Sequence, residues 1–302
     1  MNVELSERPG IGAGDAEAAE LAARLADAQS PGGTFLSRVE LPWGESEDRN
    51  CFVTALVVRE LHGIAGDGVA EARRRALAYL LRSRYPVYRD LFSFYPHRGH
   101  PFWMRSALYP DADDTAVINL ELVRAGLMST DALAEVAERH LLPNRAVGEG
   151  ARHLDRPWHR EGVFLTWLTG APVANPVDCC VNTNVVALLA AAGMRTAPGY
   201  AEACEMVDAA ARDVSRAGVH DRRRTPFYPA PGEWLRALRH AVEMGATELE
   251  PAARALATVP DPEAGAEAPA ICCDVEGTVV WRSTAVAVAR RLRAAAIEKE
   301  TR

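Results

Sequence analysis

The chain has no apolar run that approaches the roughly 18 residues required for a membrane span. Its first residues also lack the basic stretch and apolar core of a secretory signal, so we expect a cytoplasmic protein. The 6 cysteines include two adjacent pairs but no Cys-x-x-Cys spacing, which excludes a disulfide scaffold and a typical redox motif. Strand patterns are nearly absent.

An excess of positive charge is missing as well, since the formal net charge is −7 at pH 7. Binding to a phosphate backbone needs a basic face, so we expect no nucleic-acid partner. The 302 residues are 48% hydrophobic, which is enough for one large core. We therefore expect a single domain over 1–302, with a flexible N-terminus over 1–13.

Helical periodicity, by contrast, recurs from end to end. Gly and Pro stand at most of the expected helix ends, where they act as stop signals. Polar-faced segments alternate with segments that are apolar nearly all round, and a helix of the second kind is covered by its neighbours. About ten helices are expected, over 15–28, 47–61, 69–81, 113–125, 130–142, 178–192, 200–216, 232–243, 250–258 and 283–297.

A repeat underlies this alternation. Four apolar helices begin with a small polar residue, and their threonines (Thr54, Thr115, Thr183, Thr284) are separated by 61, 68 and 101 residues. The last interval spans two units, so one helical hairpin recurs about every 50–65 residues. No polar capping repeats stand out at the termini. The predicted fold is therefore all-α, an (α/α) toroid of about five to six hairpins rather than an open solenoid.

One of these helices opens with three carboxylates. Asp111, Asp113 and Asp114 follow Pro110 and lead into Thr115, Ala116 and an apolar run. Ionised carboxylates that leave water cost several kcal/mol each unless they are paired or protonated. Because crowded carboxylates cannot all ionise, at least one pKa should rise well above about 4. A carboxylic acid kept neutral in this way is a proton donor.

Two long loops, 85–110 and 143–177, are rich in aromatic residues and lack helical periodicity. Loops of this length are commonly functional, and their aromatic content argues against disorder. In a toroid the inner-helix N-termini and the loops before them converge on one mouth, beside the carboxylates. The candidate ligand-contacting residues are Phe94, Tyr95, Phe102, Trp103, Tyr109, Trp167, Asn182 and Trp281.

The run Asp111-Ala112-Asp113-Asp114-Thr115-Ala116 resembles the Asp-x-Asp-Asp-Thr-Ala signature of class II terpene cyclases, most closely the squalene–hopene cyclase group. The segment from Gly277 to Ala285 is similar to that family's Gly- and Trp-containing repeat. The resemblance implies a toroid in which the middle aspartate, Asp113, protonates a linear isoprenoid, with Asp111 and Asp114 holding and polarising it. Aromatic side chains would then stabilise the carbocations through their π faces.

The resemblance also bears on cofactors and partners. Protonation needs no metal or organic cofactor, whereas a substrate diphosphate would be held by Mg²⁺ or by nearby arginines. Members of this family commonly enclose the substrate between two α-barrel domains, and 302 residues suffice for one. The cavity would then be smaller, open, or completed by a second copy or a partner domain, and peripheral contact with a membrane is a further expected interaction.

Other functions fit parts of the same pattern. A non-catalytic toroid could bind an apolar ligand or a partner protein. An (α/α)-barrel glycoside hydrolase would use Asp113 as acid and Glu161 or Asp155 as base. The pair Asp178 and Cys180 resembles two zinc ligands of the protein prenyltransferase β subunit, although the third ligand, a histidine, has no counterpart near the last inner helix.

Overall fold

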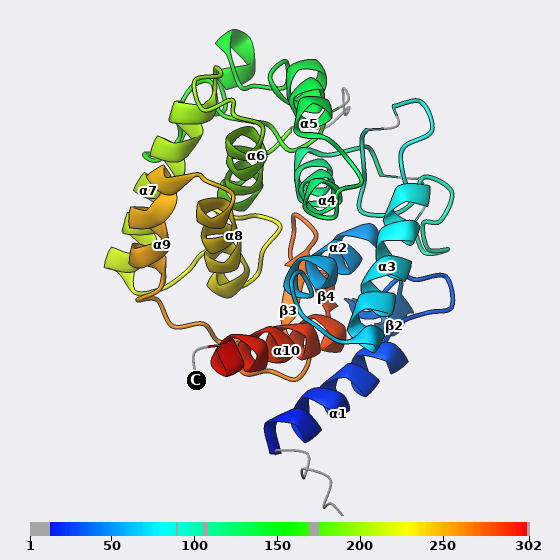
Figure 1. Cartoon of the computed structure of the whole chain (residues 1–302). Helices are drawn as coiled ribbons and strands as arrows, with labels where there is room; N and C mark the ends of the chain where they lie inside the picture. The colour runs from blue at the N-terminus through cyan, green and yellow to red at the C-terminus, as the bar shows by residue number, and fades with distance from the viewer. Residues whose placement is uncertain (1–12, 89, 105–107, 169–174, 301–302) are drawn as a thin grey trace, which may run out of the picture.

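The computed structural model describes residues 13–88, 90–104, 108–168 and 175–300, so the expected flexible segment 1–13 lies outside it up to residue 12. The chain is mostly helical (Figure 1), and the expectation of about ten helices is confirmed. The helices are α1 (Ala13–Asp27), α2 (Cys51–Glu60), α3 (Asp67–Arg82), α4 (Ala112–Arg124), α5 (Thr130–Val136), α6 (Cys179–Ala191), α7 (Tyr200–Ala217), α8 (Pro231–Glu243), α9 (Glu250–Leu256) and α10 (Thr284–Glu300).

Helices α2, α4 and α6, which are buried over most of their length, pack together with α8 and α10. Helix α4 lies between α2 and α6, α6 packs on α8, and α2 packs on α10. The remaining helices cover them from outside, and Figure 1 shows α5, α7 and α9 lying outside α4, α6 and α8. Every residue of α2 is buried, as expected of a helix with neighbours on all sides.

Polar residues cap the buried helices. Asn50 Oδ1 accepts the Val53 N–H at 2.8 Å and opens α2. Asp178 Oδ1 accepts the Cys180 N–H at 2.6 Å and opens α6. Each cap satisfies a backbone donor that has no partner within its helix, and a cap of this kind contributes about 1 kcal/mol.

A small antiparallel sheet corrects the all-α expectation. It consists of β1 (Ser37–Leu41), β2 (Gly44–Asp48), β3 (Ala270–Cys273) and β4 (Val280–Arg282), in the order β2-β1-β4-β3. Strands of three to five residues are too short for a clear alternation of polar and apolar residues. The helix expected from residue 47 begins at Cys51 because residues 44–48 pair with β1.

The sheet joins the two ends of the chain. Val39 of β1 faces Trp281 of β4, which brings the strand before α10 beside the first strand of the β1–β2 hairpin that precedes α2. Trp281 therefore lies next to the start of α2, although 230 residues separate them in sequence. None of the described helices combines the length and apolar character of a membrane-spanning segment.

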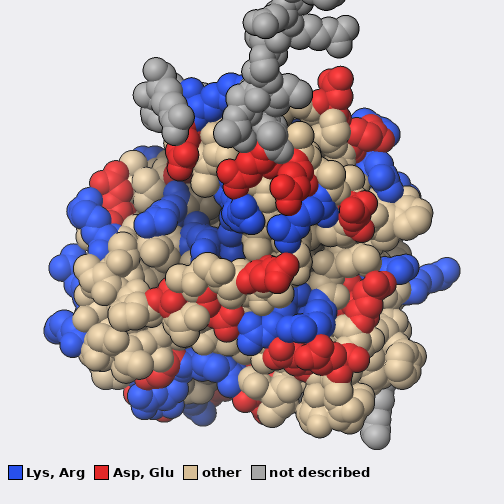
Figure 2. All heavy atoms as spheres, turned by 90° about the horizontal axis from the view of Figure 1, so that it is seen from below, with Lys and Arg blue, Asp and Glu red and all other residues tan. Residues whose placement is uncertain are grey.

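Buried ion pairs connect α2, α8 and α10. Arg290 of α10 reaches Glu233 of α8 at 2.6 Å and Glu60 of α2 at 3.5 Å. Arg293, one turn further along, reaches Glu243 at 3.3 Å. On the face seen from below in Figure 2, acidic and basic side chains are interspersed rather than segregated by sign.

We predict that Arg290→Met lowers the free energy of unfolding by about 3 kcal/mol, because it leaves the buried Glu233 without its closest cation. Arg293→Met is the matched control: its partner Glu243 is 42% exposed, so the loss should stay below about 1 kcal/mol. Urea unfolding followed by circular dichroism measures both. Equal losses in the two variants would contradict a structural role for the buried pair.

Candidate acid site

The three carboxylates occupy the first turn of α4. Asp111 is the N-cap, and its Oδ1 accepts the Asp114 N–H at 2.7 Å. Asp113 and Asp114 follow within the helix, and all three side chains are buried. The expected burial of the acidic cluster is therefore present in the structure.

Asp111 and Asp114 form a pair. Their carboxyl groups hydrogen-bond to each other. Burial raises the pKa of Asp111 to about 7, and the bond from Asp114 opposes this rise. Burial and the charge of Asp111 raise the pKa of Asp114 well above its usual value. A protonated Asp114 that donates to Asp111 accounts for both directions.

The residues that hold Asp113 differ from those expected. Asn184 of α6 donates its Nδ2–H to Asp113 Oδ1 at 2.7 Å, and the Tyr228 hydroxyl donates to Oδ2. We expected Asp111 and Asp114 to hold this side chain, but in the structure they bond to each other. The charge of Asp113 instead raises the pKa values of both flanking acids, and side chains that follow one another in a helix point in different directions.

The surroundings of Asp113 act on its acidity in opposite directions. Burial raises its pKa, while the hydrogen bonds from Tyr228 and Asn184 and the charge of Arg59 lower it. Arg59 lies in α2, is itself buried, and its Nη1 has no hydrogen-bond partner. The carboxyl is thus kept out of water while its ionised form has two donors and a nearby cation.

A row of aromatic rings leads away from Asp113. Tyr228 lies 6.1 Å from Phe52, Phe52 lies 6.2 Å from Phe94, and Phe94 lies 4.8 Å from Trp281, measured between ring centroids. Trp103 follows at 6.4 Å from Trp281. These five residues, the aromatic row, are packed edge to face or tilted, as aromatic pairs prefer. Phe94 and Trp103 are only half-buried.

The structure brings together four of the eight ligand-contacting candidates. Phe94, Trp103 and Trp281 belong to the aromatic row, and Tyr95 packs against Phe94 at 4.9 Å.

The other four lie elsewhere or serve the backbone. Phe102 is 94% exposed and Tyr109 is 43% exposed. Trp167 packs against Phe227 at 6.0 Å rather than on the row. Asn182 accepts the Phe164 N–H and donates to its carbonyl, so its amide is occupied by a loop.

Phe52, Tyr228 and Asp48 were not among the site candidates expected from the sequence. Tyr228 follows Phe227 in the loop before α8, and Phe52 is one apolar residue among many in α2. Asp48 ends β2, a strand that was not expected. Only tertiary packing brings these residues to the site, so no spacing in the sequence marks them.

Alternative catalytic sets are not assembled around Asp113. Glu161 Oε1 accepts the exposed Gly148 N–H at 2.8 Å, and Asp155 pairs with Arg156 at 3.3 Å at the surface. Burial raises the pKa of the Cys180 thiol well above its usual value. Among the described residues, no three His, Cys, Asp or Glu side chains are grouped as a metal site.

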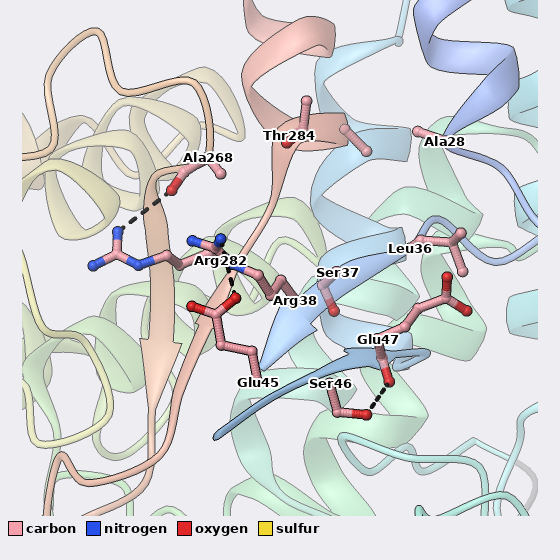
Figure 3. A pocket seen from close by; sticks show the side chains of 11 residues that line it. Ala28, Leu36, Ser37, Arg38, Glu45, Ser46, Glu47, Ala268, Arg282 and Thr284 are labelled. Carbon is pink, nitrogen blue, oxygen red and sulfur yellow. Dashed lines mark hydrogen bonds and ion pairs between the residues drawn. The ribbon is translucent and has the colours of Figure 1, made fainter. Parts of the chain in front are cut away.

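Surface grooves lie apart from the acidic cluster. Figure 3 shows one of about 500 Å³ beside β1 and β2, lined by charged side chains that include Arg38, Glu45 and Arg282. Another, of about 410 Å³, runs along α3 and the end of α4 and is lined mainly by apolar residues. Neither is lined by Asp113 or by the aromatic row.

Neither a protein-family model nor a curated protein matches the chain. Among solved structures it is similar to a protein from Actinoplanes, at 15% identity and a TM-score of 0.48, over 93% of this chain and 98% of that one. It is also similar to the type II terpene cyclase MstE from Scytonema, at 15% identity and a TM-score of 0.44, over 96% and 99% of the two chains. A variant of MstE in complex with merosterolic acid A gives 14% identity and a TM-score of 0.46, over 95% and 97%.

The Asp111–Asp114 pair predicts a pH dependence of stability. Both pKa values are raised above the unfolded value of about 4, that of Asp111 to about 7. The folded state then binds more protons than the unfolded state between about pH 4 and pH 7, so stability falls as pH rises through this window. Asp114→Asn keeps a neutral donor facing Asp111 and removes one titrating carboxyl. The free energy of unfolding of this variant should therefore fall less with rising pH than that of the wild-type protein.

Urea unfolding at pH 5 and pH 8 tests this expectation. Asp131→Asn, at an exposed position, serves as the control and should keep the wild-type pH slope. A slope for Asp114→Asn that equals the wild-type slope would show that the pair does not share a proton.

Proposed function

We propose that this chain is a class II terpene cyclase-like enzyme in which Asp113 protonates a double bond of a linear isoprenoid. The observation that carries the proposal is the environment of Asp113. Its carboxyl is buried, both oxygens accept hydrogen bonds, and one of the two donors, Tyr228, begins a row of aromatic rings. A carboxylic acid, an apolar surrounding and π faces are the three requirements of alkene protonation.

The first requirement is a strong acid at a fixed position. An alkene is a very weak base, so the conjugate base of the donor must be stabilised when the proton leaves. The donors Tyr228 and Asn184 and the charge of Arg59 supply that stabilisation. Burial keeps the carboxyl protonated until the substrate is bound and excludes competing water.

The reaction balances without a cofactor. The Asp113 O–H bond breaks, and the π electron pair of the alkene forms the new C–H bond, which leaves a tertiary carbocation. The next double bond attacks this cation and closes a ring. Loss of a proton from the final cation forms a new double bond, and a proton returned to Asp113 restores the acid, so the product is an isomer of the substrate.

The aromatic row supports the second half of this reaction. A cation held over an aromatic face is stabilised by about 2 kcal/mol when it is desolvated. Phe52 and Phe94 follow Tyr228 along the row, so a cation formed at Asp113 would meet further π faces as it migrates.

The finer features of the fold belong to the same proposal. The five helices α2, α4, α6, α8 and α10 would form the inner ring of a toroid, joined between α8 and α10 by Arg290 and Glu233. We further propose that the enzyme is cytoplasmic. A second copy, a partner domain or a membrane surface would cover the single barrel, and Mg²⁺ would be required only for a diphosphate-bearing substrate.

Replacement of the proton donor is the direct test. Wild-type protein incubated with linear C10 to C30 isoprenoids should yield cyclic isomers by gas chromatography and mass spectrometry. Asp113→Asn should yield none, because an amide cannot transfer the proton, while circular dichroism and ligand binding stay unchanged. Cyclic products from both proteins, or from neither, would reject the assignment.

The hydrogen bond from Tyr228 should affect the rate of the reaction as well as stability. Tyr228→Phe removes one donor to the Asp113 carboxylate, so turnover should fall about 100-fold at unchanged substrate affinity. Tyr200→Phe is the matched control, because it removes a buried tyrosine hydroxyl that bonds Glu248 away from the site. A comparable loss in the two variants would indicate that packing rather than the donor is responsible.

A further inference from the structure

A second buried carboxylate lies at the other end of the aromatic row. Asp48, the last residue of β2, is buried, and its two oxygens accept three hydrogen bonds. Trp281 Nε1 and Asn50 Nδ2 each donate to Oδ2 at 2.9 Å, and Tyr95 Oη donates to Oδ1 at 3.0 Å. Burial raises the pKa of Asp48, while these three donors lower it because indole and amide N–H groups can only donate and so favour the ionised form.

Two of these three donor groups belong to aromatic side chains at or beside the aromatic row. Trp281 is a member of the aromatic row, and Tyr95 packs against Phe94 at 4.9 Å. A hydrogen bond from a ring N–H or O–H to a carboxylate shifts electron density into the ring and makes its π face more negative. The aromatic row therefore begins beside Asp113 and passes through Tyr228, Phe52 and Phe94. It then reaches Trp281, whose ring N–H donates to the Asp48 carboxylate.

Among the residues that the structure describes, no cation occupies these faces. In the part of the chain that the structure describes, the cation–π contact is that of Arg224 over Trp158, outside the row. Within the described ranges, the negative charge behind Trp281 and Tyr95 thus has no cation on the ring faces.

We propose that Asp48 is a positioning residue that orients Trp281 and Tyr95 and makes their rings a binding site for the positively charged end of an isoprenoid cation. This proposal rests on the proposed function and extends it. Asp113 starts the cation at one end of the row, and Asp48 favours its migration toward the other. The preferred ligand class is a hydrocarbon chain that carries a positive charge remote from water.

The test uses a stable mimic of that cation. The probes are N,N-dimethylgeranylamine, an ammonium ion at neutral pH, and its uncharged carbon isostere. Their dissociation constants are measured by calorimetry in an Asp113→Asn background, which removes turnover and the charge of the acid itself. The Asp113→Asn protein should bind the ammonium probe more tightly than the isostere.

Asp48→Asn should weaken the ammonium probe about tenfold and change the isostere less than twofold. Asn at this position can accept from Trp281 and donate to Tyr95, so the hydrogen bonds are kept while the charge is lost. Glu40→Gln is the control: it removes a carboxylate that bonds Arg282, next to Trp281, and should change neither constant. Trp281→Phe, which keeps a ring but loses the N–H, should lower the ammonium affinity if Asp48→Asn does not fold.

Equal weakening of both probes, or no preference for the ammonium probe before Asp48 is changed, would overturn the role of Asp48. The readout is separate from turnover. A wild-type protein that prefers the ammonium probe yet cyclises no isoprenoid would reject the proposed function and leave the role of Asp48 standing.

Discussion

The hydrogen-bonded group around Asp113 is the constraint on which the site depends, because it joins three segments of the chain. Asp113 belongs to α4, Asn184 to α6 and Tyr228 to the loop before α8. A buried carboxyl is tolerated only where donors satisfy it, and removal of one partner leaves an uncompensated group that costs about 1–3 kcal/mol. The bond that stabilises the packing of α4 against α6 is therefore the same bond that sets the acidity.

The buried carboxylates differ in what their partners let them do. Asp178 bonds only to backbone N–H groups and serves as a cap, although burial raises its pKa to about 7. Asp111 and Asp114 share a hydrogen bond with each other. Asp113 is held by side chains and lies beside one end of the aromatic row. Asp48 accepts hydrogen bonds from the edges of rings near the other end of that row. Position relative to the rings, rather than burial alone, separates the structural acids from the chemical ones.

Much of the fold could be predicted from the sequence because helix periodicity is a local signal. The expected segments 200–216 and 232–243 match α7 and α8 to within one residue at each end. The strands could not be predicted, because β1 pairs with β4 across more than 230 residues and each strand is too short to show a period. The same reason hid Asp48, which gains its partners only when the sheet forms.

The acid cluster itself was visible, because three carboxylates before an apolar helix are costly in any fold. Its hydrogen bonds were not, since Asn184 and Tyr228 come from segments 71 and 115 residues away. The aromatic candidates were predicted from loop composition, which cannot tell a ring that faces inward, such as Trp281, from one that faces solvent, such as Phe102.

Incubation with a linear isoprenoid in D₂O tests the central claim most directly, because the proton of Asp113 exchanges with solvent. Protonation by this carboxyl predicts a cyclic product with one deuterium on the alkene carbon that accepted the proton, detected by mass spectrometry and NMR. The Asp113→Asn protein should form no such product. A cyclic product without deuterium would contradict proton transfer from Asp113.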